Sequence, residues 1–131
     1  MAKARRSVAV VDELLAEKSA TLSQAQALTT MGMQQSAQAL WARAAALEEQ
    51  IAPLLDASGD DREAAVHRIS AASCYEKAGD PSRATNLYRA ALAGPLPDVT
   101  RKEVEKMLTA CLIALKASPD SKGARKVTSA L

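Results

Sequence analysis

The sequence of 131 residues contains no phenylalanine, and its only aromatic residues are one tryptophan and two tyrosines. A core with so few large side chains must gain its packing from close approach of the backbone elements. Alanine is abundant instead: it supplies 29 of the 131 residues, and it has the highest helix propensity of all residues. The composition therefore predicts an all-α chain. The length suits one domain that folds without disulfides or a metal.

Cysteine and histidine are also scarce, which argues against a metal site. Cys74 and Cys111 have neither a CxxC partner nor a histidine at ligand spacing. We interpret both as reduced core residues, as expected in a cytosolic protein. His67 has one carboxylate at helical spacing, Glu63 four residues earlier, and no cysteine three or four residues away, so its pattern favours packing over metal binding. We expect no metal and no cofactor.

The glycines are few and isolated, so no glycine-rich phosphate-binding loop of the GxxxxGK[ST] or GxGxxG type is present. Three pairs of adjacent carboxylates, Asp12–Glu13, Glu48–Glu49 and Asp60–Asp61, diverge around a helix. We interpret them as solvated surface or helix starts rather than as an acid–base pair. No nucleophile and base stand at a spacing that predicts a triad. The sequence thus favours a protein that is not an enzyme.

Long hydrophobic runs are missing as well. No segment approaches the roughly 18 apolar residues of a membrane span. The short apolar run 8–11 is followed at once by Asp12 and Glu13, so we expect no signal peptide. These features predict a cytoplasmic protein without a membrane partner.

The net charge of +2 conceals an uneven distribution. Residues 12–63 carry nine acids and three bases, whereas residues 64–131 carry eleven bases and six acids. Such asymmetry could steer an acidic partner or let two copies attract each other head to tail, although a segregated solvated surface explains it too. Nucleic-acid binding through the basic half is less favoured, because acids are interspersed and stacking aromatics are missing.

Apolar spacing and helix-breaking residues predict five helices, over residues 7–30, 34–57, 61–78, 81–93 and from about 98 to 117. Pro53 predicts a kink or an early end of the second helix. Asp60 with Glu63, and Thr100 with Glu103, have the spacing of capping boxes. We expect residues 1–117 to form one domain and residues 118–131 to be a frayed basic tail.

A self-similar pattern occurs twice, 47 residues apart. In each copy a glycine is followed by a small residue after five positions, an aromatic residue after nine and another small residue after twelve. The first copy is Gly32, Ala37, Trp41 and Ala44, and the second is Gly79, Ala84, Tyr88 and Ala91. Self-similarity at a fixed period is typical of stacked helical hairpins. The pattern predicts that both rings are wedged between consecutive hairpins.

The segment Ala72-x-x-Tyr75-x-x-x-Gly79-Asp80-Pro81-x-x-Ala84-x-x-x-Tyr88-x-x-Ala91 resembles a tetratricopeptide repeat (TPR). The resemblance is good over residues 61–97 and weaker over 18–52, where Thr21 and Gln24 replace large apolar residues. It implies two TPR-like antiparallel helical hairpins plus a C-terminal capping helix, that is, a short α-solenoid. It also implies a non-catalytic adaptor or scaffold that binds a partner helix or extended peptide in a concave groove.

In such a fold the groove maps onto the first helix of each hairpin and onto the last helix. The resemblance implies a partner-binding groove lined by Val66, Ile69, Ser70, Ser73, Glu76, Lys77, Arg101, Lys102, Glu105 and Leu108. The earlier copy contributes Ser19, Leu22, Ser23, Gln26, Thr29 and Thr30. The partner is expected to be another protein or peptide. The alternative is a structural protein that assembles with itself into a homo-oligomer.

Overall fold

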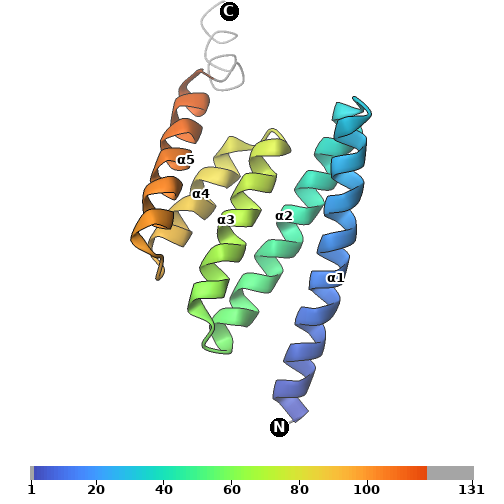
Figure 1. Cartoon of the computed structure of the whole chain (residues 1–131), viewed down its shortest axis with the longest axis vertical. Helices are drawn as coiled ribbons and strands as arrows, with labels where there is room; N and C mark the ends of the chain where they lie inside the picture. The colour runs from blue at the N-terminus through green and yellow to red at the C-terminus, as the bar shows by residue number, and fades with distance from the viewer. Residues whose placement is uncertain (1, 118–131) are drawn as a thin grey trace, which may run out of the picture.

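The computed structural model describes residues 2–117, with side chains from residue 8 onward. This part of the chain is all helical and contains no strand. The helices are α1 (Ala2–Thr30), α2 (Gln34–Ala57), α3 (Asp61–Lys77), α4 (Pro81–Leu92) and α5 (Asp98–Ala117). They stand in a row in chain order, with α1 at one end and α5 at the other (Figure 1). The extensive helix pairs are α1–α2, α2–α3, α3–α4 and α4–α5.

The first three connections are built alike. Gly32, Gly59 and Gly79 have φ values of 78°, 83° and 82°, a left-handed conformation that glycine adopts without steric cost. In each turn the next residue donates its N–H to the carbonyl five positions earlier, over 2.9, 2.8 and 2.8 Å. This is the Schellman termination, which satisfies carbonyls at the end of the preceding helix. Identical turns give successive helices a regular antiparallel arrangement.

Several expectations about helix ends need correction. Helix α1 begins at Ala2, earlier than residue 7. Helix α2 continues through Pro53 to Ala57, so the expected early end does not occur. Ile51 and Leu55, on either side of the exposed proline, are buried, and their packing holds this last part of the helix in place. Tertiary burial thus outweighs the loss of one helical hydrogen bond.

The caps were predicted with mixed success. The Asp80 carboxylate accepts from the backbone N–H of Arg83 at 3.1 Å, which confirms the predicted start of α4. Asp60 makes no capping bond with its side chain, so the first capping box is wrong. Thr100 lies inside the first turn of α5, which begins at Asp98, so the second is wrong too. The start of α3 directly after Asp60 is as predicted, whereas the box at Thr100 placed the start of α5 too late.

Small side chains dominate the core. More than half of the buried hydrophobic residues in the described part are alanines, which allow the helices to approach closely. The aromatic residues of both predicted repeat copies are buried: Trp41 is 6% exposed and Tyr88 is 0% exposed. Both rings belong to the same apolar cluster together with Ala37, Ala44 and Ala84, and Ala91 is buried as well. Cys74 and Cys111 are buried in it as free thiols, as predicted.

A second, smaller apolar cluster lies at the other end of α2. Ile51, Ala52 and Leu55 pack there with Ala64 of α3, and Leu14 and Leu15 of α1 cover them. Along α2 the two clusters are separated by Glu48, which is 1% exposed. A buried charge therefore interrupts the apolar contacts of the first three helices.

Candidate functional site: a groove between α1 and α3

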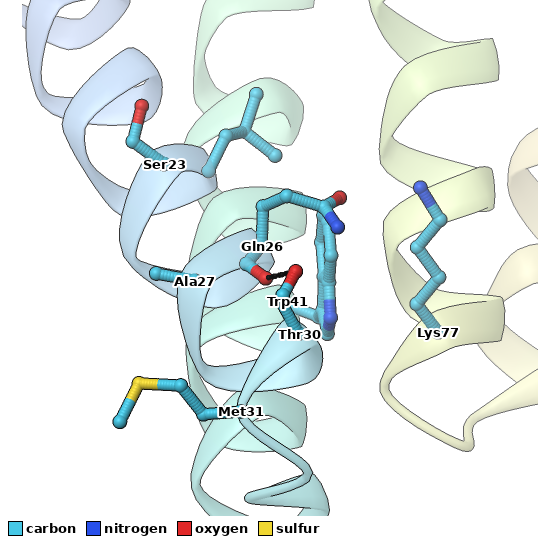
Figure 2. A pocket seen from close by; sticks show the side chains of 8 residues that line it. Ser23, Gln26, Ala27, Thr30, Met31, Trp41 and Lys77 are labelled. Atoms are coloured by element: carbon cyan, nitrogen blue, oxygen red, sulfur yellow. Dashed lines mark hydrogen bonds between the residues drawn. The ribbon is translucent and has the colours of Figure 1, made fainter.

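An open surface hollow lies between α1 and α3, with α2 as its floor. It has a volume of about 830 Å³ and is lined by Leu22, Ser23, Gln26, Ala27, Thr30, Met31, Trp41 and Lys77. Figure 2 shows Gln26, Thr30 and Trp41 gathered on one side, with Lys77 reaching toward them from α3. We call this hollow the α1–α3 groove.

Trp41 forms the floor of the groove. Its indole Nε1–H donates to the Thr29 hydroxyl at 3.2 Å, so the polar edge of the ring is satisfied inside the protein. The ammonium group of Lys77 lies 4.4 Å from the centre of the ring. A cation at this distance over an indole ring contributes about 0.5–1 kcal/mol when exposed. The contact holds Lys77 at the edge of the groove, above an apolar surface.

The α1 wall of the groove carries no charge. Residues 19–42 contain no aspartate, glutamate, lysine, arginine or histidine. At the tip of this hairpin Met31 is 69% exposed and Met33 is 46% exposed. Flexible, polarizable methionine side chains adapt to differently shaped partners. The groove thus combines an uncharged, partly apolar wall with one cation on the opposite side.

Further along α2, Glu48 connects all three helices. Its Oε1 atom lies 3.2 Å from the Nζ of Lys18 on α1 and 3.0 Å from the Nδ1 of His67 on α3. Because a carboxylate only accepts, the Nδ1 atom of His67 must carry the hydrogen of this bond. Oε2 of Glu48 is buried without a hydrogen-bond partner in the described part of the chain. Burial raises the pKa of Glu48, but the hydrogen bonds and charges of His67 and Lys18 outweigh it and hold the pKa below its usual value.

The interpretation of Glu48 as solvated surface was therefore wrong. Helix α2 packs against both α1 and α3, so its side chains that face either neighbour are buried. Glu48 stands seven residues after Trp41, which places it on the same face of the helix. That spacing was the available signal. The partners Lys18 and His67 are distant in sequence, and no local pattern links them to Glu48.

The structure separates the groove residues expected on α3. Lys77 lines the hollow, while Ser70 and Ser73 are half-buried and Ile69 packs against the core. Val66 is 53% exposed, and the Glu76 carboxylate accepts from the Tyr88 hydroxyl. This bond and burial of the ring keep the pKa of Tyr88 above its usual value, burial being the larger cause. Contact of these residues with a partner stays a prediction.

On α5 the expected residues have different environments. The Arg101 guanidinium donates to the backbone carbonyls of Leu92 at 2.7 Å and Gly94 at 3.0 Å, and so closes the end of α4. Leu108 packs against the core, and Lys102 and Glu105 are exposed. From the earlier copy, the hollow gathers Leu22, Ser23, Gln26 and Thr30. The groove is therefore built from the weaker of the two repeat copies.

The arrangement has little chemical reactivity. Burial, followed by the charge of Glu48, raises the pKa of Cys74, and burial with Glu76 raises the pKa of Cys111 to about 11. Both thiols are therefore poor nucleophiles near neutral pH. Within residues 2–117 no three histidine, cysteine or carboxylate side chains come together as a possible metal site.

Comparison with known proteins gave no relative: no family model, no curated protein and no solved structure matches the chain. None of the helices in the described part is both long enough and apolar enough to cross a membrane.

Proposed function

We propose that this protein is a non-catalytic interaction module of the TPR-like type, which holds a helix or extended segment of another protein in the α1–α3 groove. The observation that carries the proposal is the hollow of about 830 Å³ whose floor is Trp41. Tryptophan in a concave site is the residue most often responsible for binding energy in protein interfaces. An amphipathic helix docks in such a groove through its apolar face.

The groove's lining defines what such a segment must present. Leu22, Met31 and the face of Trp41 favour apolar side chains, and the amide of Gln26 and the hydroxyls of Ser23 and Thr30 supply hydrogen bonds. Lys77 is the one charged group of the lining, so an acidic group of the partner near it is favoured over a basic one.

The single tryptophan makes the proposal directly testable, because indole fluorescence reports on this groove alone. Proteins captured from a lysate with the wild-type chain are compared with those captured by Gln26→Arg, which fills the groove with a long cationic side chain. Gln24→Arg is the matched control, since Gln24 is an exposed glutamine on the same helix and does not line the hollow. We expect specific proteins to be lost with Gln26→Arg and retained with Gln24→Arg.

A protein identified in this way is then titrated against the purified chain while Trp41 fluorescence is followed. A saturable change with the wild type and with Gln24→Arg, much weaker with Gln26→Arg, supports the proposal. Equal capture by both variants, or binding without any change in Trp41 fluorescence, excludes the α1–α3 groove as the binding site.

A further inference from the structure

The two helices at the ends of the row have outer faces that no other helix within residues 2–117 covers. Helix α1 packs extensively only against α2, and α5 only against α4, and they lie at opposite ends of the molecule (Figure 1). In stacked helical proteins the terminal faces are normally polar, because a bare apolar face promotes association. The outer face of α5 departs from that rule because it exposes two large aliphatic side chains.

The outer face of α5 combines exposed aliphatic and basic residues. Val99 is 76% exposed and Ile113 is 62% exposed. Lys102 and Lys106 stand between them at helical spacing and are exposed as well. All four lie on the side opposite the buried Val104 and Cys111 that anchor α5 to α4. We call Val99, Lys102, Lys106 and Ile113 the α5 end face.

The outer face of α1 is small and acidic. Ala9, Glu13, Ala16 and Ala20 recur every three or four residues and are all exposed. They lie opposite the residues that pack on α2, and we call them the α1 end face. Beside this face, Asp12 is exposed as well, and Val8 and Val10 are 60% and 44% exposed. Alanines on a helix surface permit close approach of a second helix, and the acids attract a basic one.

We propose that a second copy of this chain docks here, with the α5 end face of one molecule against the α1 end face of the next. The charges are complementary: Lys102 and Lys106, the latter also 3.4 Å from Glu103 on its own helix, meet Glu13 and the neighbouring Asp12. The side-chain sizes suit each other too, since valine, isoleucine and the lysine stems are exposed on α5 and small alanines are exposed on α1. The contact continues the row of helices from one molecule into the next.

Such an interface is heterologous, because two different surfaces of the chain meet. Repetition of a heterologous contact produces a ring or an open chain rather than a closed dimer with two identical faces. The α1–α3 groove stays accessible in this arrangement, so self-association adds to the proposed function without replacing it.

The test measures molar mass by sedimentation velocity from low to high micromolar concentration, at low and high salt. We expect the mass to rise with concentration and the association to weaken with salt, since the charges lie at the surface. Lys102→Glu/Lys106→Glu reverses the charge of the α5 end face, and Asp12→Lys/Glu13→Lys reverses that of α1. Each should weaken self-association about tenfold or more, equivalent to about 1.4 kcal/mol.

Mixing the two double variants provides the decisive experiment. In the mixture each reversed face meets a partner face of opposite charge, so association should return to nearly the wild-type level. Arg62→Glu changes an equally exposed charge in the first turn of α3, away from both end faces, and should associate like the wild type. Circular dichroism of every variant verifies that the helices are intact.

A chain that stays monomeric at all concentrations overturns the proposal, as does equal weakening by Arg62→Glu. Failure of the mixed variants to associate also overturns it, because the proposed contact brings opposite charges together in the mixture. Loss of association in Gln26→Arg would place the contact in the α1–α3 groove and overturn it as well. Groove binding that survives in a strictly monomeric protein leaves the proposed function standing alone.

Discussion

Replacement of Glu48 by glutamine tests how the first three helices are held together. Glu48 is 1% exposed, and its Oε1 atom accepts from both Lys18 and His67. Glutamine keeps the size and the acceptor but removes the charge. A hydrogen bond to a charged group contributes about 1.5–3 kcal/mol and a neutral one about 0.5–1.5 kcal/mol, so two contacts lose about 2 kcal/mol together. We therefore expect a decrease of about 2 kcal/mol in the free energy of unfolding at pH 7.

The effect has a defined pH dependence. Because the pKa of Glu48 is lowered in the folded protein from its ordinary value of 4.5, ionised Glu48 stabilises the fold above that value. This contribution is lost as the pH falls through the lowered pKa of the folded state. A protonated glutamate resembles glutamine, so the wild type and Glu48→Gln should converge in stability well below pH 4.5.

Urea denaturation followed by far-ultraviolet circular dichroism, at neutral pH and at several acid values, measures both quantities. Glu105→Gln is the control, because Glu105 is exposed on α5 and its substitution should change the stability by less than about 0.5 kcal/mol. A Glu48→Gln protein as stable as the wild type at pH 7 would refute the reasoning. So would a stability difference that persists unchanged in acid.

Three further predictions concern the turns and the core. Gly79→Ala should destabilise the protein by about 1–2 kcal/mol in the same urea titration, because a φ of 82° strains any side chain and the new Cβ would lie 3.3 Å from the side chain of Gln38. The control Gly94→Ala, at a residue whose φ is not positive, should leave the stability nearly unchanged. Arg101→Ala should cost about 1–3 kcal/mol in that assay, because two backbone carbonyls after α4 lose a charged donor; an unchanged midpoint would contradict this. Cys74 and Cys111 should resist a thiol reagent at pH 8 in the native protein and both react in denaturant, since both are buried and their pKa values are raised. Rapid native labelling of either would show that the core opens more readily than its packing indicates.

The architecture was largely predictable from sequence because its determinants are local. Gly32 and Gly79 end helices through their own backbone freedom, and Asp80 caps the next helix three residues away. Trp41 and Tyr88 are buried as the repeat indicates, because the spacing from each glycine turn fixes the helix face on which the ring lies. Membership of the TPR family stays a prediction, since it concerns more than the order and burial of the helices.

The composition of the groove was less predictable, because it depends on contacts between distant segments. The hollow is bounded by the α1 wall, by Trp41 of α2 and by Lys77 of α3, whose ammonium group lies over the indole ring. Arg101 had the right helix position for a groove residue, yet it turns toward the carbonyls that follow α4. Spacing along the helix does not distinguish an Arg101 side chain that faces a groove from one that faces the end of α4, since both orientations place the residue on a partly buried face. Only the position of the neighbouring helix decides between them.

The groove and the Glu48 contacts are two consequences of one feature, the burial of α2 between α1 and α3. Because α1 and α3 each pack extensively on α2, the width of the groove between them is set by the α2 side chains that both helices contact. Trp41 is such a side chain within the groove. Glu48 is another, two turns further along α2, where it contacts Lys18 of α1 and His67 of α3. A change at Glu48 should therefore alter partner binding at Trp41 without touching the groove itself. In Glu48→Gln, weaker binding in the fluorescence titration with an intact circular dichroism spectrum would demonstrate this coupling, and unchanged affinity would show that Trp41 and the α1 wall hold their positions independently.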